Sequence, residues 1–174
     1  LTVARRAAAV DARCRKGDWK KITTRDISGG TLGLLGLGAI GKLVAKRVQG
    51  FGMTVLAYDP FWNEEYAAAN HIIKAAPEEI YAQADVISLH LPLTEETRGT
   101  IGKKEIEMMK PDAILINTAR GGLIDEDALL DALEAGRLYG AGIDAFAQEP
   151  PEDKRWFALE NVVLGSHCAA STEG

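Results

Sequence analysis

The chain of 174 residues lacks any long hydrophobic stretch. Its apolar runs fall well short of the roughly 20 residues that a membrane-spanning helix needs, so we expect no membrane partner. Residues 1–10 are too short, and too interrupted by Arg5 and Arg6, to form a secretion signal. With 47% apolar and 26% charged residues, the composition is typical of a globular protein, and the length favours one domain.

Cysteine is scarce, and positive charge is in deficit. Cys14 and Cys168 lie far apart without CxxC spacing, so we expect no metal site and a reducing compartment, the cytoplasm. The net charge of −5 gives no broad attraction for nucleic acid. Basic residues cluster between Arg5 and Arg25, but aspartates alternate with them, which favours a solvated helix face over a polyanion site.

Glycine, in contrast, forms the motif Gly36-Leu37-Gly38-Ala39-Ile40-Gly41. The apolar run 31–35 before it predicts a buried strand, and the helical spacing of Ile40, Leu43, Val44 and Val48 predicts a helix from Ala39 to Phe51. In such a turn the first glycine permits unusual dihedral angles, the second admits a pyrophosphate, and the third allows close packing of helix on strand. Amides at the start of the helix would face phosphate.

An acidic residue follows at a distance that suits a dinucleotide. Gly52 ends the predicted helix, residues 53–58 are predicted to form a second strand, and Asp59 stands 18 positions after Gly41. A carboxylate there can accept hydrogen bonds from both ribose hydroxyls and would repel a 2′-phosphate, which favours NAD over NADP. A bare glycine motif also occurs in simple turns and in S-adenosylmethionine sites, but this order of strand, helix, strand and acid favours a dinucleotide.

Strands and helices continue to alternate along the chain. Further strands are predicted at 85–89, 113–117, 138–143 and 161–164, with helices at 77–82, before Pro111 and at 125–135. This order predicts an α/β fold, a doubly wound parallel sheet of Rossmann type, preceded by an alanine-rich helix at residues 2–16. Ligands bind beyond the carboxyl ends of such strands, where Asp59, His90, residues 117–122, Asp144 and His167 are expected.

Four stretches resemble the NAD-dependent D-isomer-specific 2-hydroxyacid dehydrogenases, a family that includes D-3-phosphoglycerate dehydrogenase. They are GLGAIG at 36–41, HLPLTEETRGTIG at 90–102, NTARGGLIDEDALLDAL at 117–133, and GIDAFAQEP at 142–150, which leads to His167 in GSHCAAST. The resemblance implies NAD as cofactor and an oxidoreductase that transfers a hydride between NAD(H) and a small D-2-hydroxy acid or 2-oxo acid. It covers most of the chain after Gly30.

The resemblance also implies three catalytic residues. Arg120 would hold the substrate carboxylate and polarise the carbonyl, work that suits the rigid, permanently charged fork of a guanidinium. His167 would exchange a proton with the carbonyl oxygen, and Glu149 would orient it. An unperturbed imidazole titrates at about pH 6.5, and a nearby carboxylate stabilises its protonated form, which keeps a proton available near neutrality.

The remaining implied residues bind the cofactor. Asp144 would accept a hydrogen bond from the nicotinamide carboxamide, and His90, Pro92 and Thr94 match a loop that lines the cofactor, where His90 need not titrate. His71 is expected at the surface. The full predicted set is Gly36, Gly38, Ala39, Ile40, Gly41, Asp59, His90, Leu91, Pro92, Thr97, Thr118, Ala119, Arg120, Asp144 and His167.

The chain departs from the family pattern in two ways. Ser166 and Cys168 flank the histidine where many relatives have proline and an apolar residue. Relatives also have a separate substrate domain, so we expect residues 1–174 to be an excised dinucleotide-binding domain that turns over poorly. Residues 1–17 would be the remnant of one inter-domain helix, and residues 171–174 the start of another. Family dimers often pair through this domain, so a homodimer is also expected.

Three alternatives remain open. NAD-responsive transcriptional corepressors of this fold keep the arginine, glutamate and histidine, although they often carry bulky aromatics beside the histidine that residues 168–170 lack. Formate dehydrogenases share the architecture but have glutamine at the position of Glu149. An S-adenosylmethionine-dependent methyltransferase could use a related glycine turn, but would not explain Arg120, Glu149 and His167.

Overall fold

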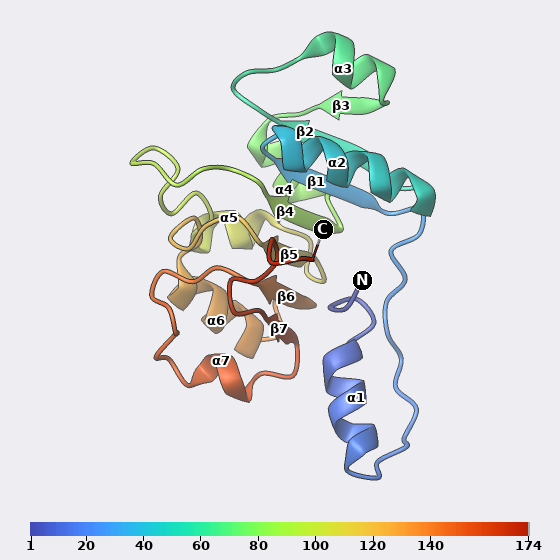
Figure 1. Cartoon of the computed structure of the whole chain (residues 1–174), viewed down its shortest axis with the longest axis vertical. Coiled ribbons are helices and arrows are strands. Elements are labelled where there is room, and N and C mark those ends of the chain that lie inside the picture. The colour runs from blue at the N-terminus through green and yellow to red at the C-terminus, as the bar shows by residue number, and fades with distance from the viewer. Residues whose placement is uncertain (174) are drawn as a thin grey trace.

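Residues 1–173 are described by the computed structural model, and their centre is a parallel sheet (Figure 1). Its seven strands lie in the order β3-β2-β1-β4-β5-β6-β7. The order reverses between β1 and β4, which is the switch point where doubly wound sheets bind ligands. The predicted Rossmann-type fold is therefore confirmed. The strands are β1 (Thr31–Leu35), β2 (Thr54–Tyr58), β3 (Ile72–Lys74), β4 (Val86–Leu89), β5 (Ile114–Asn117), β6 (Gly140–Ile143) and β7 (Val162–Leu164).

Helices cover both faces of the sheet. They are α1 (Ala7–Arg15), α2 (Ala39–Val48) with the 3₁₀ turn η1 (Gln49–Phe51), α3 (Glu64–Ala69), α4 (Pro77–Gln83), α5 (Lys103–Met108), α6 (Glu126–Glu134) and α7 (Arg155–Ala158). Local sequence explains where several of them begin. The Asp125 side chain accepts a hydrogen bond from the backbone of Ala128 and caps α6, and Pro77 occupies the first turn of α4. No helix among residues 1–173 is long and apolar enough to cross a membrane.

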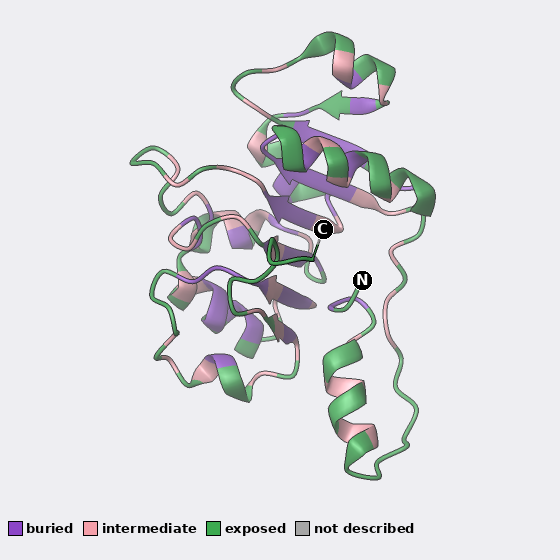
Figure 2. Cartoon of the chain, in the orientation of Figure 1, coloured by how far each residue is buried: buried purple, intermediate pink, exposed green. Residues whose placement is uncertain are grey.

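The hydrophobic core divides into two main parts, one on each face of the sheet (Figure 2). On one face, α4, α5 and α6 pack around Ile87, Leu115 and Leu129, each of which is fully buried. On the other face, α2 covers Leu32 and Leu34 of β1. Both faces of a parallel sheet need such cover, because strands of this kind are apolar on both sides.

Helix α2 is present as predicted, but its buried side differs from the prediction. Gly41 and Ala45 are buried, whereas Ile40 is 61% exposed and Leu43 46% exposed. The small residues face the sheet because Gly41 lies against the backbone of the preceding turn. The helical spacing therefore predicted the helix correctly and its packing face in part, since Val44 and Val48 do pack against the core.

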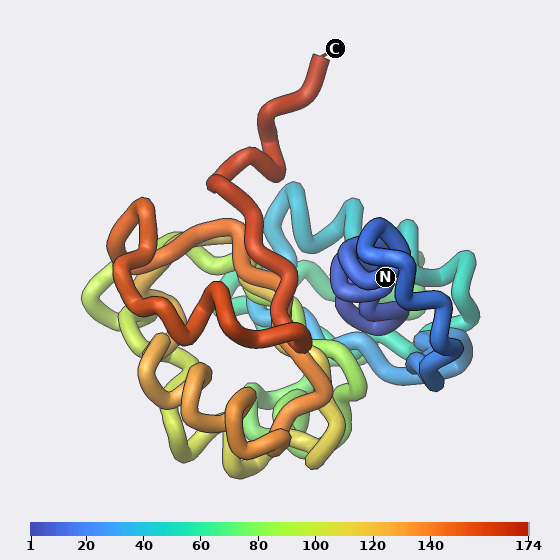
Figure 3. Tube along the Cα trace, turned by 90° about the horizontal axis from the view of Figure 1, so that it is seen from below, coloured from blue at the N-terminus to red at the C-terminus, as the bar shows by residue number. Residues whose placement is uncertain are grey.

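The start of the chain also corrects one prediction, and the helix start expected at residues 171–174 stays a prediction. The helix expected from residue 2 begins only at Ala7, because Val3 and Ala4 are buried against Ile114 and Arg6 has a left-handed backbone with φ 46°. Helix α1 itself has no buried residue and projects from the body (Figures 1 and 2). Residues 171–173 form no helix and lead away from the sheet (Figure 3), and residue 174 lies outside the described part of the chain.

Candidate active site

The glycine turn after β1 has a separate structural reason for each of its three glycines. Gly36 has φ +102°, and a Cβ there would lie 2.6 Å from the His90 carbonyl oxygen. A Cβ on Gly41 would lie 2.3 Å from the carbonyl oxygen of Gly36. A Cβ on Gly38, by contrast, would have no atom within 4 Å. The first and third glycines thus build the turn, and the second leaves an open backbone surface at the start of α2.

Asp59 follows β2 and is tied to this turn. Its Oδ2 accepts a hydrogen bond from the backbone of Leu37 at 2.6 Å, and its Oδ1 accepts one from the backbone of Phe61 at 2.8 Å. A carboxylate oxygen can accept more than one hydrogen bond, so the group can hold the turn and still receive ligand hydroxyls. Contact between Asp59 and ribose stays a prediction.

A cavity of about 430 Å³ lies at the carboxyl ends of the central strands. Two alanines outside the predicted set, Ala169 and Ala170, contribute to its wall, and the one sequence signal for them is that they follow His167. Nine of the predicted residues line it: Ile40, His90, Leu91, Pro92, Thr118, Ala119, Arg120, Asp144 and His167.

The other predicted residues lie around the cavity or support it. Gly36, Gly38, Ala39, Gly41 and Asp59 belong to the turn region and are not among its lining residues. The remaining one, Thr97, lies in the loop after β4 and uses its hydroxyl within that loop. Its Oγ1 donates to the Pro92 carbonyl oxygen at 2.7 Å and accepts a hydrogen bond from the Thr94 backbone N–H.

His90 forms part of the cavity wall in an uncharged state. Burial lowers its pKa, and its Nε2 lies 3.0 Å from Oγ of Ser88. A lowered pKa means that the ring is neutral at neutral pH. This agrees with the expectation that His90 need not titrate.

Arg120 is exposed, and the loop that carries it is held by a buried amide. Asn117, at the end of β5, donates from Nδ2 to the Arg120 carbonyl oxygen at 2.9 Å, and its Oδ1 accepts from the Ala119 backbone at 3.1 Å. Asn117 is only 2% exposed. Its side chain thus fixes the backbone on both sides of the arginine, while the guanidinium remains available to a ligand, with one N–H donated to the Ala119 carbonyl oxygen.

His167 and Glu149 form a pair beside this cavity. Nδ1 of His167 lies 2.9 Å and 3.0 Å from the two carboxylate oxygens of Glu149. Hydrogen bonds from the Phe146 backbone and from His167 lower the pKa of Glu149, so this carboxylate is ionised at neutral pH. Because Nδ1 is engaged, Nε2 is the ring nitrogen that can exchange a proton with a ligand. Sequence reasoning from the residues alone could not have placed these two side chains in contact.

These features are a glycine turn at the start of α2, and an arginine and a carboxylate–histidine pair at a neighbouring cavity. A comparison with protein families shows that residues 1–169 match the model described as "D-isomer specific 2-hydroxyacid dehydrogenase, NAD binding domain". The chain belongs to this family. The predicted resemblance is therefore confirmed, together with the expectation of an NAD-binding domain.

Members of the 2-hydroxyacid dehydrogenase family that match the chain include a D-3-phosphoglycerate dehydrogenase of Methanocaldococcus jannaschii, 42% identical over 99% of this chain and 34% of the relative. A glyoxylate reductase of Thermococcus litoralis is 42% identical over 99% of this chain and 55% of its own length. The solved structure of a D-lactate dehydrogenase from Aquifex aeolicus, complexed with NAD and lactic acid, has a TM-score of 0.89 at 32% identity, covering 99% of this chain and 57% of that one. The chain thus spans between a third and just over half of these relatives.

Proposed function

We propose that this chain is the NAD-binding half of an oxidoreductase that transfers a hydride between NAD(H) and a small D-2-hydroxy acid or 2-oxo acid. The observation that carries the proposal is the Glu149–His167 pair at the edge of the cavity that Arg120 also lines. The open backbone at Gly38 and the carboxylate of Asp59 fit the pyrophosphate and ribose of NAD. When bound, the nicotinamide would supply or accept the hydride.

Three side chains of this domain bind the substrate, transfer the proton and orient the proton donor. Arg120 binds the substrate carboxylate and draws electron density toward the carbonyl oxygen. His167 donates a proton from Nε2 to that oxygen during reduction and recovers it during oxidation. Glu149 holds the ring through Nδ1 and stabilises the charged imidazolium before the proton leaves.

The names of the relatives support this substrate class. Glyoxylate reductase, hydroxypyruvate reductase and D-3-phosphoglycerate dehydrogenase all act on small carboxylic acids, as their names state. An arginine at the cavity is the group expected for such acids. The corepressor alternative gains no support from these relatives.

The cofactor assignment is tested by titrating the chain with NADH and NADPH and following nicotinamide fluorescence. We expect NADH to bind more tightly, and the Asp59→Asn variant to lose about tenfold in NADH affinity and to discriminate less against NADPH, because the repulsion of the 2′-phosphate is removed. Gly38→Ala should fold normally, since its new methyl has no neighbour within 4 Å, yet should bind NADH poorly because the methyl occupies the pyrophosphate approach. Equal or tighter binding of NADPH by the unaltered chain would overturn the role of Asp59.

We also infer that the chain is the cofactor domain of a longer cytoplasmic protein whose remaining part supplies a substrate domain, with residues 1–17 as an inter-domain segment. The greater length of the relatives supports this. So does an apolar cavity of about 340 Å³ between α2 and the N-terminal turn, with Leu1, Val3 and Phe51 in its wall, which further chain could fill. Cys14 and Cys168 are both free, as a reducing compartment requires.

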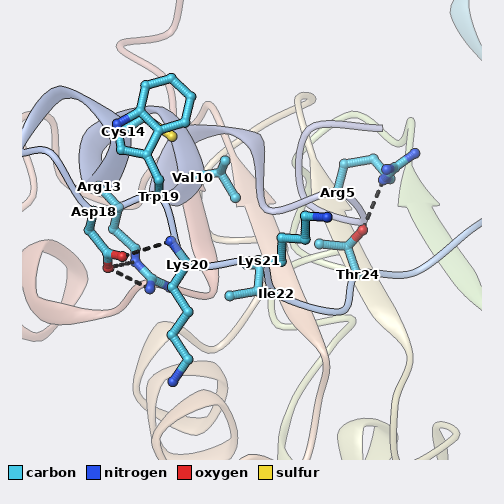
Figure 4. A pocket seen from close by; sticks show the side chains of 10 residues that line it. All are labelled: Arg5, Val10, Arg13, Cys14, Asp18, Trp19, Lys20, Lys21, Ile22 and Thr24. Carbon is cyan, nitrogen blue, oxygen red and sulfur yellow. Dashed lines mark hydrogen bonds and ion pairs between the residues drawn. The ribbon is translucent and has the colours of Figure 1, made fainter.

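A homodimer built on the N-terminal segment is part of the same proposal. Trp19 is 79% exposed beside a cavity of about 390 Å³ that lies between α1 and the extended chain after it (Figure 4). The ion pair between Arg13 and Asp18 shapes one side of this cavity. Residues 1–25 carry eight Arg and Lys against two Asp, although the whole chain has a net charge of −5. The excess of negative charge therefore lies in the rest of the chain, and we propose that residues 1–25 bind that part of a second copy.

Sedimentation velocity over a range of concentrations tests the dimer. We expect Trp19→Ala to raise the dimer dissociation constant by about tenfold or more, because exposed tryptophans are frequent anchors of interfaces. Phe61→Ala is the matched control, since Phe61 is 91% exposed but lies far along the chain from residues 1–25. This variant should leave the dimer unchanged. A chain that sediments as a monomer at every concentration would contradict the proposal.

A further inference from the structure

We propose that Asp144 is a positioning residue whose carboxylate holds the loop that carries His167 and thereby keeps the imidazole against Glu149. This inference rests on the proposed function, because the position of His167 matters only if that ring exchanges a proton. It differs from the predicted carboxamide contact in that it concerns what the carboxylate does within the protein.

The carboxylate of Asp144 is buried and receives two consecutive backbone N–H groups. Asp144 is 7% exposed and directly follows β6. Its Oδ1 lies 3.2 Å from the backbone nitrogen of Cys168, and its Oδ2 lies 2.8 Å from that of Ala169. Hydrogen bonds to an ionised carboxylate are stronger than those between neutral groups. The two residues immediately after His167 are therefore anchored to the end of β6.

The backbone of His167 needs such an anchor. Its φ is 59°, in the left-handed region that is unfavourable for residues with a Cβ. A residue persists there only when its surroundings hold it. Glu149 holds the ring, and Asp144 holds the backbone that follows. If the hydrogen bonds from the loop to Asp144 were lost, the backbone of His167 would relax toward negative φ and carry the ring away from Glu149.

Gly165 shows that the loop is shaped around this carboxylate. A Cβ on Gly165 would lie 1.9 Å from Oδ1 of Asp144 and 2.9 Å from its Cγ. The φ of Gly165 is not in the left-handed region, so its backbone conformation does not require glycine. The reason for glycine at this position is space for the Asp144 side chain. Gly165 is itself fixed to β6, because its N–H donates to the Ile143 carbonyl oxygen at 2.8 Å.

The same geometry links the wall of the cavity to the proton donor. Asp144 and His167 both line the cavity assigned to the cofactor. The backbone N–H of Asp144 donates to the Asn117 carbonyl oxygen at 2.9 Å, which ties the end of β6 to the residue that holds the Arg120 loop. One buried carboxylate thus sets the position of His167 relative to the strand ends that carry the rest of the site.

Two variants test the proposal in the cofactor-free chain. Gly165→Ala keeps every charge and removes only the space for the Asp144 carboxylate. Asp144→Asn keeps the volume but offers a single acceptor to two N–H donors. The readout is the ¹⁵N and ¹H spectrum of the three histidine rings, in which the ¹⁵N chemical shift of His167 Nδ1 reports its hydrogen bond to Glu149. His71 and His90 serve as internal references.

We expect both variants to fold and to shift the Nδ1 resonance of His167, because the hydrogen bond to Glu149 is lost. Gly50→Ala is the control, because a Cβ there meets no atom within 4 Å, and it should keep the signal. In the full-length protein, kcat should fall about tenfold or more in both variants, with a smaller change in KM for NADH. A folded Asp144→Asn chain with an unchanged His167 spectrum would overturn the proposal, even if Gly165→Ala failed to fold. Failure of the proposed function would appear instead as absent NADH binding by the unaltered chain with its His167 signal intact.

Discussion

Replacing Gly121 by alanine is expected to lower the free energy of unfolding by roughly 2–4 kcal/mol. A Cβ at this position would lie 1.9 Å from the carbonyl oxygen of Phe146, 2.1 Å from its carbonyl carbon and 2.6 Å from the nitrogen of Ala147. All three are backbone atoms, so no side chain can swing aside to make room. The loop after β5 and the loop after β6 would have to move apart.

Neither loop is free to make that movement. Asn117 holds the first loop through the Arg120 carbonyl oxygen. On the second loop, Glu149 accepts a hydrogen bond from the Phe146 backbone at 3.0 Å, and Glu126 accepts one from the Ala147 backbone at 2.6 Å. The methyl group would therefore strain or break these contacts, and any relaxation would separate Arg120 from the Glu149–His167 pair.

Urea denaturation followed by circular dichroism measures this effect. The matched control is again Gly50→Ala, which adds the same methyl group in open space and should change the midpoint little. NADH fluorescence on any folded fraction of the Gly121 variant would report whether the cavity survives. An unfolding midpoint equal to that of the unaltered chain would show that the two loops can separate without cost, and the rigid contact described here would be wrong.

Hydrophobic patterns predicted the elements of the fold better than their packing. The strand 31–35, the glycine turn and the helix from Ala39 follow from local sequence, and each is present. The buried face of α2 follows only in part. Val44 and Val48 pack against the core, but Gly41 and Ala45 are buried where Ile40 and Leu43 are exposed. Periodicity shows that a helix has an apolar side, but a contact of Gly41 with the preceding turn decides which side packs.

The N-terminal segment also shows that local sequence does not decide packing. An alanine-rich composition predicts one helix from residue 2, and the structure instead buries Val3 and Ala4 against the sheet and starts the helix after a left-handed Arg6. Helix propensity is a weak preference of a fraction of a kcal/mol per residue, so burial of two apolar side chains overrides it.

For the candidate site, the functional residues could be predicted, but the contacts that support them could not. Family resemblance placed Arg120, Glu149 and His167 together in function, and the structure places them around neighbouring loops. The supporting contacts could not be predicted, because they join residues far apart in the sequence at distances of a few ångströms. Gly121 against Phe146 and Gly165 against Asp144 are such contacts, and no local pattern marks them.

The largest expected effect on activity belongs to His167. In the full-length protein, His167→Ala should lower kcat for the reduction of 2-oxo acids by NADH by roughly 10²–10⁴, the usual contribution of a positioned general acid. Glu149→Gln should lower kcat less, because an amide oxygen can still accept the Nδ1 hydrogen bond but no longer stabilises the imidazolium by charge. A panel of 2-oxo acids assayed at saturating NADH measures both variants and identifies the acids that the enzyme accepts.

The pattern across the two variants separates proton transfer from general disruption of the site. Loss of the general acid should affect kcat for every accepted acid by a similar factor, whereas a distorted cavity should raise KM by amounts that depend on the acid. Arg120→Lys supplies the contrast, since it keeps the positive charge but loses the paired N–H donors, and it should raise KM as well as lower kcat. If His167→Ala retained full kcat, the proton would have to come from another group, and the pairing of Nδ1 with Glu149 would be structural rather than catalytic.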